Sequence, residues 1–415
     1  MKIKLSGKSN ISTAICLYVC LSLLFLLYLI GSSTGKVVFD ERFFFPNIKV
    51  LEQYGFSFAF LKNMKEQSPG PLYQYIYYPL KYIMPLTPKN LRYVNFLFLV
   101  GDLYFLHLLV RLDQNKNTFL IPLLIVGIPM TWGISGIAMT ELPSLFFCLF
   151  SIWLFRRALN SGSKLPLILS AFAGLAMGTA IIGRSPFLMV LPAILLIYSL
   201  PGKGWHTSTF LAFSVIFPCV VFYAWQGLVP PDVQNIQSGI NPMFLFFAVT
   251  YLVLATIVIY PSFFILPKTH YGVAAIIAVL SFLGNIIVCK ISYSPMNGVL
   301  TSKLIPRVIQ TIYPYLFLPM AIGITYIFAT ALFFHLMRNK QSFWKLFYLI
   351  ISLLIIVTTV KSSAHFSSRY VMQAYPFFLL YVAGSIKVSK FLLLRVVVGT
   401  VIGIASLCAC YAIYS

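Results

Sequence analysis

Charged side chains are scarce in this sequence of 415 residues. They make up 9% of it, and Asp and Glu together number only eight, against 30 Lys and Arg. Hydrophobic residues reach 60%, which excludes a soluble globular protein and indicates an integral membrane protein. The apolar segments also lack the strict alternation of polar and apolar residues that membrane β-barrels show, so we expect helices.

The residue spacings of metal and disulfide sites are absent as well. The seven cysteines include no Cys-x-x-Cys pair, and the five histidines are scattered singly. We therefore predict no cofactor; a divalent metal is compatible with the sequence but not favoured. The excess of Lys and Arg lies between apolar segments, where it favours lipid head groups or phosphate as partners and not nucleic acid.

Apolar runs near the length that crosses a bilayer, roughly 20 residues, recur along the chain. The first covers residues 11–30 and follows Lys2, Lys4 and Lys8, which places the N-terminus in the cytoplasm. A cleaved signal peptide is the alternative, because Gly31-Ser32-Ser33 offers small residues, but the run is long for a signal. The fold class we expect is an all-α, polytopic transmembrane bundle that forms one domain over residues 1–415. Its further spans are expected near 92–111, 118–136, 142–157, 165–183, 186–200, 207–226, 243–266, 271–289, 314–336, 345–361, 370–386 and 392–412, about thirteen in all with the first.

The short basic connections agree with this topology. Counting spans from the N-terminus assigns every one of them to the cytoplasmic side, as the positive-inside rule requires. They are Arg111–Lys116, Arg156–Lys164, Lys203, Lys268, Arg338–Lys345 and Lys387–Arg395.

Two segments form the largest predicted outer loops. In residues 32–90, apolar side chains recur every three or four positions from Asn47 to Gln67, which predicts an amphipathic helix in the membrane interface. Tyr73, Tyr75, Tyr77 and Tyr78 follow, and we expect them to form an aromatic belt. The late outer loop covers residues 290–313 and carries Arg307.

Asp40 and Glu41 stand side by side shortly after the first span. Adjacent carboxylates at the edge of a membrane helix are energetically costly, which favours a functional role. Solvation of the loop or capping of the next helix is the alternative. We take both residues as catalytic candidates.

Three more charged residues stand at the outer ends of predicted spans. Glu141 lies in Thr140-Glu141-Leu142-Pro143, where helix capping is again the alternative. Arg184 lies in Gly183-Arg184-Ser185-Pro186, and Arg369 in His365-Phe366-Ser367-Ser368-Arg369-Tyr370. Interfacial anchoring would also explain the arginines, but a guanidinium group matches phosphate oxygens well.

Together these motifs resemble the glycosyltransferase-C (GT-C) superfamily of polytopic enzymes. Asp40-Glu41 is similar to its acidic signature in the first outer loop. Ser68-Pro69-Gly70-Pro71-Leu72-Tyr73, Thr140-Glu141-Leu142-Pro143 and Gly183-Arg184-Ser185-Pro186 resemble segments of the protein mannosyltransferase-like and aminoarabinose-transferase-like families. The string Asp40-Glu41-Arg42-Phe43-Phe44-Phe45-Pro46 also resembles the dolichyl-phosphate-glucose glucosyltransferases, without the histidine of that family.

The resemblance implies transfer of a sugar from a polyprenyl-phosphate donor to a glycan, lipid or protein on the non-cytoplasmic face, with inversion. We expect Asp40 to act as general base with Glu41 and Glu141 as further catalytic groups. Arg184, Arg369, Lys65, Tyr73 and Arg307 are the expected donor-binding residues.

Two other functions remain open at this point. A lipid-linked saccharide transporter or flippase would also carry many spans, but should line a cavity with charge. An O-antigen polymerase or ligase would be expected to use a large late outer loop. For the transferase we expect a bacterial inner membrane with the site facing the periplasm, with the endoplasmic reticulum as the alternative.

Overall fold

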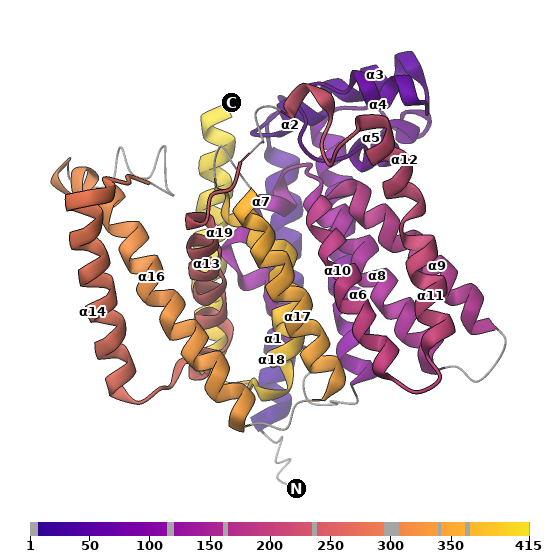
Figure 1. Cartoon of the computed structure of the whole chain (residues 1–415). Coiled ribbons are helices and arrows are strands. Elements are labelled where there is room, and N and C mark those ends of the chain that lie inside the picture. Colours follow the sequence, from indigo (N-terminus) through magenta and orange to yellow (C-terminus); the bar gives the residue numbers. More distant parts are fainter. Residues whose placement is uncertain are drawn as a thin grey trace, which may run out of the picture.

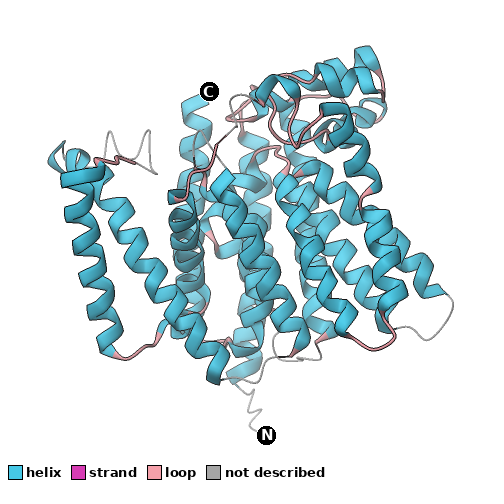
Figure 2. Ribbon diagram, in the orientation of Figure 1, coloured by secondary structure: helices cyan, strands magenta, loops and turns pink. Residues whose placement is uncertain are grey.

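A computed structural model describes residues 7–113, 120–160, 165–234, 239–293, 307–338, 342–361 and 366–414; the side chains of residues 7–11, 165, 307–311 and 414 are outside this description. In these segments the ordered elements are helices, with no strand (Figures 1 and 2). The expected all-α membrane architecture is therefore confirmed.

Nine of the described helical segments are long and apolar enough to cross a membrane. They are built from α1 (Gly7–Ser32), α6 (Pro88–Leu112), α8 (Glu141–Asn160), α9 (Leu165–Gly183), α11 (Gly204–Ser214) with α12 (Ile216–Trp225), α14 (Lys268–Gly284) with η7 (Asn285–Cys289), α16 (Arg307–Arg338), α17 (Phe343–Val357) with η8 (Thr358–Lys361), and α19 (Lys390–Tyr414).

The other four predicted spans coincide with shorter or interrupted helices. These are η2 (Ile121–Gly127) with α7 (Pro129–Gly136), η3 (Ser185–Met189) with α10 (Val190–Leu195) and η4 (Leu196–Ser199), α13 (Met243–Ile259), and α18 (Val371–Val382) with η10 (Ala383–Ser385). Proline stands within the first turn of η2, α7 and η3, a position where its missing N–H costs no helical hydrogen bond but where a preceding helix could not have continued. The count of thirteen spans stays a prediction.

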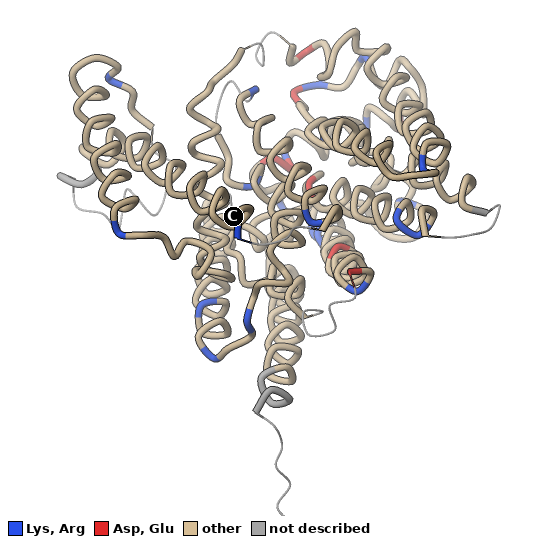
Figure 3. The backbone as a smooth tube through the Cα atoms, turned by 60° about the horizontal axis from the view of Figure 1, so that its bottom comes forward, with Lys and Arg blue, Asp and Glu red and all other residues tan. Residues whose placement is uncertain are grey.

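The two ends of the chain lie on opposite faces of the bundle (Figure 1), as an odd number of crossings requires. On the N-terminal face, α6 and α8 end, and α11, α14, α17 and α19 begin, so the described ends of the predicted basic connections share that face. Blue basic residues mark several of these helix ends in Figure 3. The opposite face carries the first loop, folded into α2 (Glu41–Phe44), α3 (Pro46–Tyr54), α4 (Phe58–Asn63), α5 (Leu72–Tyr77) and η1 (Tyr78–Tyr82).

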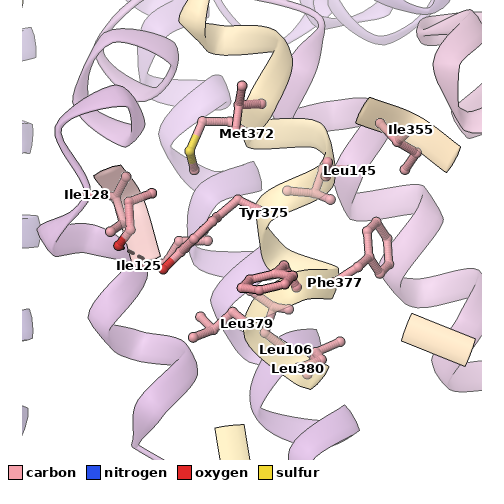
Figure 4. Close-up of a cluster of buried hydrophobic side chains, with 14 of the residues drawn as sticks. Leu106, Ile125, Ile128, Leu145, Ile355, Met372, Tyr375, Phe377, Leu379 and Leu380 are labelled. Atoms are coloured by element: carbon pink, nitrogen blue, oxygen red, sulfur yellow. Dashed lines mark hydrogen bonds between the residues drawn. The ribbon is translucent and has the colours of Figure 1, made fainter. Parts of the chain in front are cut away.

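Helix α18 lies in the middle of the main hydrophobic core, and all twelve of its residues are buried. Figure 4 shows Phe377, Leu379 and Leu380 of this helix among Leu106 of α6 and Leu145 of α8. Close packing fixes α18 by dispersion and by exclusion from lipid. The residues that precede it, including Arg369 in η9 (Ser368–Tyr370), are thereby held at its end.

The predicted amphipathic helix is two helices, so the expectation of one continuous segment was wrong. It breaks at Gly55, whose φ of 61° lies in the left-handed region that favours glycine. Helix α4 restarts after Ser57, whose hydroxyl accepts a hydrogen bond from the backbone N–H of Phe60 at 3.3 Å. The two-sided pattern is confirmed for four of its six regularly spaced apolar residues, because Ile48, Leu51, Leu61 and Met64 are buried and the charged residues of the segment are exposed. Tyr54 and Phe58, which flank the break, are exposed.

The predicted tyrosine belt is wrong for two of its four members. Tyr73 and Tyr77 are buried, and their ring centroids lie 4.4 Å apart. They pack with Phe44 and Ile48 in a small core of their own. The alternation of tyrosines therefore reflects two faces of the short helix α5 and not a row at the membrane surface.

Gly70 fixes the first loop against α9. A Cβ atom at Gly70 would overlap the carbonyl oxygen of Ile182, which belongs to the last turn of α9. We predict that Gly70→Ala lowers stability by about 1–3 kcal/mol, the usual cost of overpacking, as measured by thermal unfolding of the purified protein. Gly35→Ala in the same loop is the control, because its Cβ would meet no atom within 4 Å. Equal melting temperatures for the two variants would contradict this packing.

Candidate active site

Four charged side chains from distant parts of the sequence meet on the face that carries the first loop. Nη2 of Arg369 lies 2.5 Å from Oδ2 of Asp40, and Nε of Arg369 lies 3.5 Å from Oε1 of Glu141. Arg184 donates a hydrogen bond from Nη2 to the same Glu141 oxygen. We call the series Asp40, Arg369, Glu141 and Arg184 the ion-pair chain. All four were candidates from the sequence, and the structure brings them together.

The local backbone conformation sets the directions in which these side chains point. Helix α9 ends at Gly183, and Arg184 adopts an extended conformation before the proline-containing η3. A side chain at position 183 would collide with Ser144 Oγ and Leu72. The glycine therefore lets α9 pack closely against α8 and α5 just where Arg184 turns toward Glu141.

Asp40 follows a residue in an uncommon conformation. Phe39 has φ 54°, which is rare for a non-glycine residue and is typical of functional or tightly constrained positions. Its ring lies against Arg369, with 5.1 Å between the ring centroid and the guanidinium carbon. Phe39 thus supports the guanidinium group from one side while the following residue, Asp40, binds it.

Exposure changes along the ion-pair chain. The side chains of Asp40 and Arg369 are 21% and 14% exposed, whereas those of Arg184 and Glu141 are 9% and 2% exposed. The Asp40 end is therefore the one that a solvent-borne or lipid-borne hydroxyl group can reach. The Glu141 end lies deeper, where ionic interactions are less screened by water.

Several polar atoms at the deep end have no hydrogen-bond partner among the described residues. They are Oγ1 of Thr140, Oε2 of Glu141, Nε of Arg184, and both amide atoms of Gln373. Gln373 lies one helical turn after Arg369 and is 1% exposed. Leaving buried polar groups unpaired is costly, so this arrangement suits a bound polar ligand that supplies both acceptors and donors.

The two arginines differ electrostatically. Burial lowers the pKa of Arg184, and the positive charge of Arg369 adds to that effect against the attraction of Glu141. For Arg369, burial also opposes the charge, but the Asp40 and Glu141 carboxylates outweigh it and raise the pKa. Arg184 is thus the cation whose charge is less well compensated, and a further anion beside it would be stabilised.

Glu41 makes a separate ion pair with Arg92. Its Oε2 lies 2.7 Å from Nη2 of Arg92, and its Oε1 accepts a hydrogen bond from Nε at 2.9 Å. The backbone N–H groups of Val38 and Ala138 also donate to this carboxylate, each at 2.8 Å. Both carboxylate oxygens therefore already accept hydrogen bonds from the protein. The expected catalytic role of Glu41 stays a prediction, and this geometry does not favour it.

Arg92 was not among the predicted site residues, because it stands at the start of a predicted span. It is fully buried, and besides Glu41 it donates to Ser33 Oγ and to the carbonyl oxygens of Thr34 and Lys36. These bonds tie the end of α1 and the approach to Asp40 onto α6. A buried arginine needs such partners. In the sequence, the adjacent acids Asp40 and Glu41 were the sign that a buried cation would be found nearby.

The remaining candidates lie apart from these contacts. Tyr73 is buried, and burial, with smaller effects of Tyr77 and Glu41, raises its pKa. Lys65 has an exposed side chain, and Asn47 binds its backbone at 3.0 and 2.9 Å. Arg307 begins α16, with its side chain outside the described residues. In the described part of the chain no three His, Cys, Asp or Glu side chains group as metal ligands do.

No protein-family model and no curated protein matches this sequence. Among solved structures, the chain is similar to the crystal structure of ArnT from Cupriavidus metallidurans bound to undecaprenyl phosphate. The two are 12% identical over 90% of this chain and 77% of that one, with a TM-score of 0.44. No residue of the site takes its role from this similarity.

We predict that Arg92→Met destabilises the protein by about 3–5 kcal/mol, because it leaves the Glu41 carboxylate buried without its counter-charge. Thermal unfolding of the purified protein measures the effect. Glu52→Gln is the control, since it removes the partly exposed ion pair between Glu52 and Lys81, and such pairs contribute little. A smaller effect for Arg92→Met than for Glu52→Gln would refute the anchoring role.

Proposed function

We propose that this protein is a membrane glycosyltransferase of the GT-C type. In this proposal it moves a sugar from a polyprenyl-phosphate donor to a hydroxyl group of a glycan, lipid or protein, on the non-cytoplasmic side of a bacterial inner membrane. The ion-pair chain is the observation that carries the proposal. It combines a reachable carboxylate with two guanidinium groups, the groups needed to accept a proton and to stabilise a phosphate leaving group.

Asp40 is the proposed general base. The acceptor oxygen forms a bond to the anomeric carbon of the sugar while the bond from that carbon to the phosphate oxygen breaks. The acceptor proton passes to Asp40, and the products are the glycosylated acceptor and polyprenyl phosphate. A single displacement of this kind inverts the anomeric centre.

Arg369 and Arg184 are the proposed phosphate ligands. The donor phosphate carries one negative charge as a diester and gains a second as the sugar leaves. At the same time Asp40 loses its charge by accepting the proton. Because Arg369 contacts Asp40 at 2.5 Å, a phosphate on its other side would let negative charge move from one neighbour of Arg369 to the other. The total charge around the guanidinium group then stays constant, which lowers the cost of the step.

The contact between Arg369 and Asp40 also suggests an order of events. Arg369 holds Asp40 in an ion pair, and a donor phosphate would compete for the same guanidinium group. Loosening that contact would free the Asp40 carboxylate to accept the acceptor proton only after the donor has bound. We propose that this competition limits proton removal in the absence of donor.

Replacement of the base gives the most direct test. We predict that Asp40→Asn lowers sugar transfer from a radiolabelled polyprenyl-phosphate donor by about 10²-fold or more, because a positioned general base contributes about that much. Asp232→Asn is the control, since Asp232 is an exposed acid that accepts a hydrogen bond from the backbone of Glu66 in the first loop. We expect turnover to persist with a chelator present. Full activity of Asp40→Asn would remove Asp40 from the mechanism.

Binding of the donor phosphate can be tested without turnover. We predict that Arg184→Gln and Arg369→Gln each weaken binding of undecaprenyl phosphate about tenfold or more, because hydrogen bonds to charged groups contribute about 1.5–3 kcal/mol. Native mass spectrometry or microscale thermophoresis measures the change. Arg42→Gln is the control, because Arg42 is an exposed arginine in α2. A loss for Arg42→Gln as large as for the buried arginines would indicate nonspecific attraction of the lipid.

A further inference from the structure

A group of aromatic side chains adjoins the ion-pair chain. Phe247 and Tyr251 come from α13, Tyr293 follows η7, and Phe366 and Tyr370 flank Arg369. Tyr293 stacks on Phe247 with 4.3 Å between ring centroids, Tyr251 stacks on Phe366 at 5.8 Å, and Tyr370 meets the Phe366 ring at 6.2 Å. We call these five residues the aromatic wall.

The aromatic wall is continuous with the proposed phosphate site. The guanidinium carbon of Arg369 lies 5.5 Å from the ring centroid of Tyr370. Tyr370 in turn contacts the Phe366 ring, and Phe366 accepts a hydrogen bond at its carbonyl oxygen from the Tyr293 hydroxyl at 3.0 Å. A group bonded to a phosphate on Arg369 would therefore lie within reach of these rings.

Some of the tyrosine hydroxyls in this wall form no hydrogen bond within the described structure. Tyr251 and Tyr370 are partly exposed, and neither hydroxyl forms a hydrogen bond to another described residue. Some buried tyrosines bond within the protein, as Tyr375 does to the Ala255 carbonyl and Tyr348 does to Arg156, whereas the buried hydroxyls of Tyr73 and Tyr77 have no partner among the described residues. The wall thus presents ring faces together with open phenolic groups.

An interfacial belt of aromatic anchors would look different. Such a belt places its rings at the boundary between lipid and water, whereas Phe247 and Phe366 are 1% and 8% exposed. The phenylalanines back the tyrosines from inside the protein. Ligand sites of mainly aromatic lining with a few placed polar groups have this composition.

From this arrangement we propose that the aromatic wall is the subsite for the sugar ring of the donor, a hexose or pentose. The apolar C–H face of the ring packs on Tyr251 and Tyr370, and the sugar hydroxyls bond the phenolic groups. The sugar carbon C1 is joined to the phosphate through a single oxygen, so Arg369 places the ring beside Tyr370. This inference rests on the proposed function, because it takes the phosphate position from it.

Two lipids separate sugar binding from phosphate binding. The probes are undecaprenyl phosphate and undecaprenyl phosphate that carries glucose, mannose or 4-amino-4-deoxyarabinose. The ratio of their dissociation constants is the sugar-dependent gain. Because the bare lipid can carry one more negative charge than the diester, the change in this gain between wild type and variant is what reports the sugar contacts. We expect Tyr251→Phe and Tyr370→Phe to reduce this gain about 2- to 10-fold each, the loss of one net hydrogen bond, and to leave the affinity for undecaprenyl phosphate unchanged. Unchanged binding of the bare lipid also shows that the variants are folded.

The control removes a hydroxyl outside the wall. Tyr223→Phe in α12 keeps an exposed ring and should change neither dissociation constant. Tyr251 and Tyr370 variants that leave this gain unchanged for every sugar, or that weaken both lipids equally, would overturn the sugar subsite while leaving phosphate binding by Arg369 intact. Failure of the wild type to bind either lipid would instead overturn the proposed function, and the subsite with it.

Discussion

The cost of removing charge from water governs this structure. A buried arginine in a membrane protein needs a counter-charge, and the sequence has only eight acids to provide one. Five of the eight form ion pairs with described residues, namely Asp40, Glu41, Glu52, Asp113 and Glu141. The bundle therefore uses its acids to hold cations at the ends of helices, where they join segments that are far apart in sequence.

Among the acids without an ion pair in the described structure, Asp102 is the buried one. It is buried in α6, and neither carboxyl oxygen has a hydrogen-bond partner among the described residues. The contrast with Glu41 is informative, because Glu41 is equally buried but receives hydrogen bonds from Arg92, Val38 and Ala138. Fully satisfied groups such as Glu41 fix a conformation, whereas the unpaired atoms beside Glu141 leave the candidate site ready for a ligand.

Much of this could be predicted from the sequence because the membrane imposes strong patterns. Long apolar runs give the helices, and charges at their ends are rare enough that Asp40, Glu141, Arg184 and Arg369 stood out. Their shared face followed from counting spans. The partners could not be predicted, because pairing depends on packing between segments that lie from 43 to 329 residues apart.

The different surroundings of Asp40 and Glu41 illustrate that limit. The two residues are adjacent in sequence, yet successive side chains at the start of a helix point about 100° apart. Asp40 thus meets Arg369, while Glu41 meets Arg92. The break at Gly55 had a visible signal, a glycine followed by a capping serine, but the regular spacing of apolar residues on both sides concealed it.

The contact between Asp40 and Arg369 joins residues 329 positions apart in the chain. During synthesis, Asp40, Glu141 and Arg184 enter the membrane long before Arg369 exists. Until the last two helices are in place, Asp40 lacks its counter-ion and Glu141 has only Arg184. A chain that stops early therefore cannot assemble the site, and it retains unbalanced charge near the membrane surface. The same pairing that orders the finished protein thus distinguishes it from its own incomplete forms, which quality-control proteases can recognise by their looser packing.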